Sequence, residues 1–231
     1  MNHGFRSALA GIPLVLAFTL SGCAAPRDQR SATQAAQAIV HDTSIALQNV
    51  LEEGDRPGLR TALHGACAVL VFPHMRGGGF LAGWSGGAGV LMVRDRDQAH
   101  WLGPTFFSLG DMTIGPEVAL STWELVVVFM SCDALGPLKE GARTFSFRTS
   151  LARQSAEDDA GLAVGPDIRA FAHTEGGAVG LSLHFVELQS EERLTAASHG
   201  RALPAGQAPS GEVQQGGPVW ALRRTMERVT K

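Results

Sequence analysis

The chain has no tyrosine and only 3 cysteines among its 231 residues. So few cysteines exclude a small domain built on a framework of disulfides. Charge is also sparse, because 18% of the residues are charged and 19 basic against 22 acidic side chains give a formal net charge of −3. We therefore do not expect a protein that holds nucleic acid on a broad basic face. Beyond the first 25 positions, no apolar run reaches the length of about 18 residues that a membrane-spanning helix needs.

Motifs for catalysis or cofactor binding are also scarce. The sequence has no Walker A, H-E-x-x-H or C-x-x-C motif, and its 8 histidines lack metal-ligand spacing, so we expect no metal and no other cofactor. Gly83-Trp84-Ser85-Gly86-Gly87 matches the spelling of a nucleophile elbow. That elbow requires a helix after the serine, whereas the strand-like run Val90–Val93 follows here. We therefore expect a protein that is not an enzyme, and a hydrolase is the third alternative for its function.

The hydrophobic residues, 45% of the total, are instead in the range of an ordinary globular domain. Residues 1–22 have the features of a signal peptide: Arg6 is followed by the uncharged stretch Ala8–Leu20, which is too short to span a bilayer. Leu20-Ser21-Gly22-Cys23 resembles the bacterial lipobox, in which a peptidase cleaves just before a lipidated cysteine. An ordinary secretory signal, or a buried N-terminal helix, with an incidental cysteine is the alternative.

Lipidation at Cys23 has two consequences for location. The cysteine would carry three acyl chains, and since two chains already give stable anchoring, release from the membrane should be negligible. Ala24 follows the cysteine, which by resemblance to bacterial sorting implies the outer membrane, facing the periplasm. The lipobox thus predicts a lipoprotein of the cell envelope that carries acyl chains such as palmitate.

The residue pattern of the mature chain changes along its length. Residues 23–30 are expected to form a short tether, and residues 31–51 a helix, with a second helical stretch at 59–64. Short apolar runs follow, separated by Gly, Pro or Asp, and further segments alternate strictly; both are patterns of strands. These segments are 66–72, 80–85, 88–94, 106–109, 125–130, 144–148 and 179–185. The fold class predicted is α+β: a mainly antiparallel, curved, glycine-rich sheet, as a sandwich or partial barrel, with an N-terminal helix and short peripheral helices.

The C-terminal part is predicted to contain a short helix at 190–198, a flexible linker at 201–217 and a basic amphipathic helix at 218–231. In this last helix the apolar side chains recur at helical spacing, while Arg223, Arg224 and Arg228 fall elsewhere on its surface. Two interpretations are open. The helix docks on its own domain, or its arginines contact an anionic headgroup surface.

Cys67 and Cys132 lie in or beside apolar runs. Buried free thiols are one interpretation, because cysteine packs as a small hydrophobic residue. A disulfide between them is the other, favoured by an oxidising envelope.

The central runs, taken in order, resemble the SYLF domain, a lipid-binding family. They are Ala68–Pro73, Gly79–Gly83, Gly89–Arg94, Trp101–Pro104, Phe106–Gly110 and Ile114–Pro116. The resemblance covers residues 31–200 and is divergent, because the family's tryptophan-serine-alanine-proline box reads Trp101-Leu102-Gly103-Pro104 and Glu117 replaces a usual glutamine. It implies non-catalytic binding of anionic lipids, which are phosphoinositides in eukaryotic members and mainly other anionic lipids in a bacterial envelope.

Four basic side chains are candidates for contact with a lipid headgroup. His74 and Arg76 come just before the Gly77–Gly79 turn, and Arg94 and Arg96 close the following strand. They converge if these turns lie at one end of the sheet; alternatively they are solvated turn charges, since acidic residues interleave with the second pair. The expected partner is therefore an anionic membrane lipid. A structural or adaptor lipoprotein that binds a protein or an envelope polymer is the second alternative.

Overall fold

The computed structural model describes residues 29–52, 57–95, 100–115, 121–136, 144–148, 162–165, 167–173, 185–203 and 215–230. The predicted signal peptide, Cys23 and Arg96 lie outside these residues, as do the predicted strand at 179–184 and positions 204–214 of the linker. Among the described helices, none combines the length and apolarity that a membrane crossing requires.

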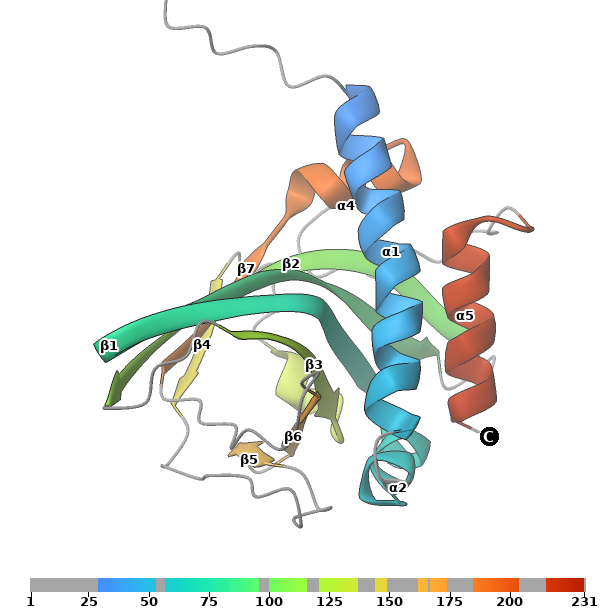
Figure 1. Ribbon diagram of the computed structural model, residues 1–231. Helices are drawn as coiled ribbons and strands as arrows, with labels where there is room; N and C mark the ends of the chain where they lie inside the picture. The colour runs from blue at the N-terminus through green and yellow to red at the C-terminus, as the bar shows by residue number, and fades with distance from the viewer. Residues whose placement is uncertain are drawn as a thin grey trace, which may run out of the picture.

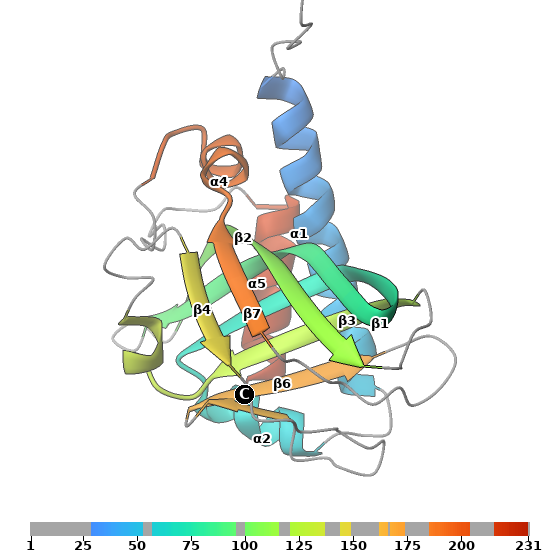
Figure 2. The same ribbon diagram turned by 90° about the vertical axis from the view of Figure 1, so that its left-hand side faces the viewer.

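Within the described residues, seven strands form a single sheet in the order β4-β7-β2-β1-β3-β6-β5, and all of these neighbours pair in antiparallel fashion. The strands are β1 Ala68–Asp95, β2 His100–Gly115, β3 Ser121–Phe129, β4 Thr144–Arg148, β5 Leu162–Gly165, β6 Ile168–His173 and β7 Phe185–Ser190. The sheet curls until its edge strands β4 and β5 approach one another, but it stays open rather than closing into a barrel (Figure 2). The predicted α+β class with a curved antiparallel sheet is confirmed.

Strand β1 doubles back on itself, so that its two halves lie next to each other in the sheet. Arg94 N donates a 2.8 Å hydrogen bond to Cys67 O, so the two ends of β1 lie side by side. Figure 2 shows the chain curling round at the β1 label. A Cβ at Gly89 would lie 2.6 Å from Val71 O, so only glycine permits this approach of the two halves. The separate strands expected at 80–85 and 88–94 are thus one continuous stretch. The reversal of β1 falls close to the turn predicted at Gly77–Gly79, because residues up to Gly77 pair with β3 and residues from Leu81 pair with β2.

The sheet buries side chains on both faces, as the alternation of its strands requires. Val69 and Val71 point to the helix-covered face, where they join Val126 and Phe106 in one cluster. The residues that alternate with them point into the concave face. These include Leu70, Phe72, Phe107, Leu125, Val127 and Phe129. Two apolar layers therefore share the same strands.

The helices are α1 Gln29–Glu52, α2 Pro57–Gly65, α4 Glu192–His199 and α5 Pro218–Val229, and a 3₁₀ turn, η1 Asp133–Leu135, follows β3. α1 and α5 lie side by side against the sheet (Figure 1), with both N-terminal ends pointing the same way. The predicted helices at 31–51, 190–198 and 218–231 are confirmed within a few residues. The stretch predicted at 59–64 begins earlier, at Pro57, because proline suits the first turn of a helix.

Candidate functional site

The structure does not bring His74 and Arg76 together with Arg94, and Arg96 lies outside the described residues. Arg94 lies beside Cys67 at the start of β1, and Arg76 lies nine positions further along the same strand. At about 3.3 Å per residue, the two arginines are separated by roughly 25–30 Å. The expected convergence of His74 and Arg76 with Arg94 is therefore wrong, because β1 doubles back with Arg94 at the opposite end from His74 and Arg76.

Arg94 has a structural role. Its guanidinium donates to His64 O at 2.8 Å and to Leu63 O at 3.2 Å, carbonyls in the last turn of α2. It also stacks over the Trp101 ring at 4.9 Å. A cation at a helix C-terminus satisfies carbonyls that lack a partner within the helix. Arg94 thus fastens α2 to the sheet and is not placed to receive a ligand.

His74 also has a partner within the protein. Its Nε2 lies 3.0 Å from Asp42 Oδ2 on α1, and His41 Nδ1 lies 3.1 Å from Asp42 Oδ1. Burial works against ionisation of Asp42, but the hydrogen bonds from the two imidazoles outweigh it and lower the pKa of this carboxyl from 3.8. The contact joins α1 to β1. Among the described candidates, Arg76 is also exposed.

A second polar contact lies on the same flank of α1. Asn49 Nδ2 donates to Glu124 Oε1 at 2.8 Å, and His173 stands directly opposite Glu124 in the β3–β6 ladder. Asn49 is seven positions after Asp42, so both face the sheet from one side of α1. These contacts connect α1 to both β1 and β3.

Helix α5 docks on the domain, as one interpretation of the sequence required. Leu222 and Met226 are fully buried in the core that α1 and the sheet share. Arg223 donates to Gly103 O at 3.2 Å, and His199 on α4 donates to Pro104 O at 2.8 Å. Side chains of α4 and α5 therefore both bind the first part of β2.

Two of these side chains have a shifted pKa. Burial lowers the pKa of His199 from 6.5, and the neighbouring guanidinium groups of Arg223 and Arg201 add to this, while the hydrogen bond to Pro104 opposes it. Burial also lowers the pKa of Arg223 from 12.5, against the attraction of Glu227. Arg223 was a candidate for membrane contact, but its contact with Gly103 turns it inward.

The other two arginines of α5 point outward. The Arg224 side chain is 63% exposed, with its NH1 3.8 Å from Glu227 Oε2 and its guanidinium 5.7 Å from the Trp220 ring centre. Arg228 is also exposed, and Trp220 is one of two large apolar side chains that are exposed among the described residues. The docked helix therefore presents an aromatic and basic outer side.

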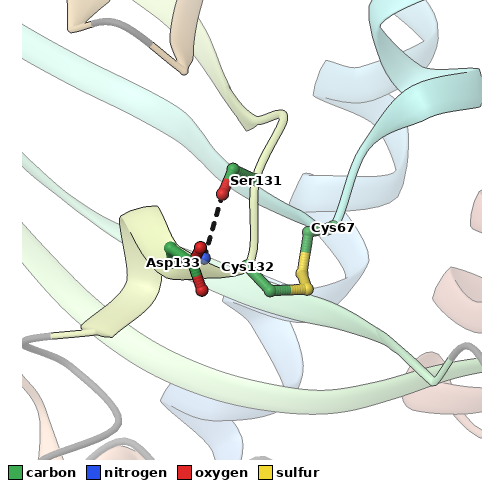
Figure 3. Close-up of a disulfide and its surroundings, with 4 residues drawn as sticks. All are labelled: Cys67, Ser131, Cys132 and Asp133. Atoms are coloured by element: carbon green, nitrogen blue, oxygen red, sulfur yellow. Dashed lines mark hydrogen bonds between the residues drawn. A yellow bond between two sulfur atoms is a disulfide. The ribbon is translucent and has the colours of Figure 1, made fainter.

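Cys67 and Cys132 are joined in a disulfide with their Cα atoms 5.3 Å apart (Figure 3). Cys67 directly precedes β1, and its N–H donates to Phe129 O, the last residue of β3. Asp133 N donates to Ser131 Oγ at 3.0 Å in the turn that carries Cys132. The bond fastens the end of the β1–β3 ladder, so of the two interpretations of these cysteines the structure has the disulfide.

The described residues offer no arrangement for metal chemistry: no group of three or more His, Cys, Asp or Glu among them could hold an ion. Ser85, from the nucleophile-elbow spelling, lies within β1, which continues as a strand to Asp95. What the described surface does offer is cations with donor groups suited to phosphate.

No family model matches the chain, and no curated protein matches it either. The resemblance to the SYLF domain therefore stays a prediction.

Three contributors to these contacts were not singled out in the sequence. Asp42 and Glu227 pair with predicted cations, and Trp220 stacks on one of them. Trp220 could have been found, because it precedes Arg224 by four residues and a helix places such residues on the same side. Asp42 could not, because its partner His74 is far away in the sequence.

Proposed function

We propose that this protein is a cell-envelope lipoprotein, anchored through Cys23, whose α+β domain binds anionic lipid without chemical change to it. The observation that carries the proposal is the start of α1 at Gln29, six residues after Cys23. At most about 3.5 Å per residue, the folded domain stays within roughly 20 Å of its anchor. Such a tether gives surface cations a high effective concentration of lipid headgroups.

Two further features support the proposal. The Cys67–Cys132 disulfide suits an oxidising compartment such as the periplasm. Exposed arginines on α5, namely Arg224 and Arg228, present the forked donors that bind phosphate in a bidentate manner. The resemblance to the SYLF domain agrees with lipid binding. Ile45 and Trp220, the exposed large apolar side chains among the described residues, lie on different helices, so the described surface gives no observation in favour of a protein-binding adaptor.

Two experiments test the proposal. In a bacterial host, Cys23→Ala should leave the protein unprocessed or soluble, and full recovery in the membrane fraction would contradict the anchor. Residues 24–231 should float with vesicles of phosphatidylglycerol and phosphatidylcholine, more weakly as salt rises. Equal flotation with pure phosphatidylcholine vesicles would contradict recognition of anionic headgroups.

A further inference from the structure

The outer side of α5 carries a stripe of three exposed residues, Trp220, Arg224 and Arg228. They are spaced by four, so the helix places them in one row along its axis. The opposite side is fixed in the core through Leu222 and Met226, both fully buried. The stripe therefore lies on a docked helix and faces away from the core of the domain.

The chemistry of the stripe combines cations with one aromatic ring. Trp220 is 40% exposed, and the Arg224 guanidinium lies 5.7 Å from its ring centre. Glu227 is the one acidic residue of α5, against three arginines, and its Oε2 lies 3.8 Å from Arg224 NH1. The helix is thus basic on a protein whose formal net charge is −3.

We propose that this stripe of Trp220, Arg224 and Arg228 is the surface that lies on an anionic phospholipid bilayer. The inference rests on the proposed function and names the contact through which it operates. Arginine donates several hydrogen bonds to phosphate oxygens, and indole rings settle at the boundary between headgroups and acyl chains. Arg223 is excluded from the contact, because it donates to Gly103 O at 3.2 Å.

The position of the stripe is compatible with the anchor at Cys23. α5 lies beside α1, and the N-terminal ends of both helices point the same way (Figure 1). The chain between Cys23 and α1 reaches up to about 20 Å, so the acyl chains and the stripe can meet the same bilayer at once. The layer of α1 and α5 then faces the membrane, and the concave face of the sheet faces away from it.

The first experiment is vesicle flotation of residues 24–231 at low salt with phosphatidylglycerol-containing vesicles. A cation near an anionic surface contributes enough that each of Arg224→Gln and Arg228→Gln should lower the partition coefficient about five-fold, and the double variant roughly 25-fold. Arg76→Gln is the matched control, because Arg76 is an exposed arginine on β1; it should change binding less than two-fold. Glu227→Gln should strengthen binding, since it removes the carboxylate beside Arg224.

The second experiment measures whether Trp220 enters the bilayer. Vesicles made with brominated phosphatidylglycerol should quench part of the tryptophan fluorescence of the wild type. The quenched part should disappear in Trp220→Phe, while Trp101, which is buried, stays unquenched in both. Circular dichroism and urea denaturation of each variant show that the fold is retained.

The outcomes separate the inference from the proposed function. If the wild type does not bind anionic vesicles at all, both fail. If it binds, but Arg76→Gln weakens binding and the Arg224→Gln/Arg228→Gln pair does not, the proposed function stands and the stripe is wrong. If the stripe variants lose binding to a soluble polyanion such as heparin and Trp220 is not quenched by brominated lipid, the partner is not a bilayer, and the inference is overturned.

Discussion

Removing the disulfide should destabilise the domain by a predictable amount. Cys67 and Cys132 are 65 positions apart, and closing a loop of this length removes chain entropy from the unfolded state worth about 4 kcal/mol. Residual structure in the unfolded chain reduces this, so we expect a loss of about 3–4 kcal/mol. With a urea dependence of about 2 kcal/mol per M, the midpoint of unfolding should fall by roughly 1.5–2 M.

The assay compares urea denaturation of residues 24–231 with and without dithiothreitol. This form retains only Cys67 and Cys132, because the third cysteine is Cys23. The Cys67→Ala/Cys132→Ala variant is the control: it should match the reduced wild type to within about 1 kcal/mol, the contribution of the lost sulfur packing, and should not respond to dithiothreitol.

A direct count of thiols decides the pairing itself. The unfolded, unreduced protein should take up no alkylating reagent, and after reduction it should take up two equivalents. Two labelled thiols before reduction, in protein purified from the periplasm, would refute the disulfide. An unchanged urea midpoint on reduction would instead refute the loop-entropy reasoning.

Three further predictions follow from the contacts. Arg94→Gln should lower stability by about 1–3 kcal/mol, because it removes charged hydrogen bonds to the end of α2, and vesicle flotation should not change. Leu222→Ala should cost about 2–5 kcal/mol in urea denaturation, since this side chain is fully buried; a loss under 1 kcal/mol would mean that α5 does not dock. Stability should fall as pH drops below 6.5, because the unfolded state protonates His199 before the folded state does. In His199→Gln the urea midpoint should depend less on pH between pH 7.5 and 5.5.

The alternation in the strands and a turn at Gly77–Gly79 could be predicted from the sequence, but the close pairing of the two halves of β1 could not. Val69 and Val71 face the helices while Leu70 and Phe72 face the concave side, as a period of two demands. Glycine marks both tight turns and places of close backbone approach. At Gly89 the second applies, because a Cβ there would lie 2.6 Å from Val71 O. Local sequence does not distinguish the two uses of glycine, since the difference depends on which segment lies next to it.

The predicted convergence of the headgroup candidates was wrong for the same reason. Whether His74 and Arg94 meet depends on the register of β1 against itself, which is fixed by tertiary contacts and not by local pattern. The hydrogen bond from Arg94 N to Cys67 O sets that register. It leaves Arg94 near the end of α2 and His74 near Asp42, so each cation gains its own partner.

Arg223 and Arg224 show how far sequence reasoning on α5 could go. They are adjacent and chemically identical, and helical spacing separates them by about 100° around the axis. Spacing does not say which of the two meets a polar partner on the domain. Arg223 does, because the carbonyl of Gly103 at the start of β2 lies under its side of the helix, while Arg224 stays 63% exposed. A substitution at Arg223 therefore changes docking and binding together, and only Arg224 and Arg228 can report on the membrane contact alone.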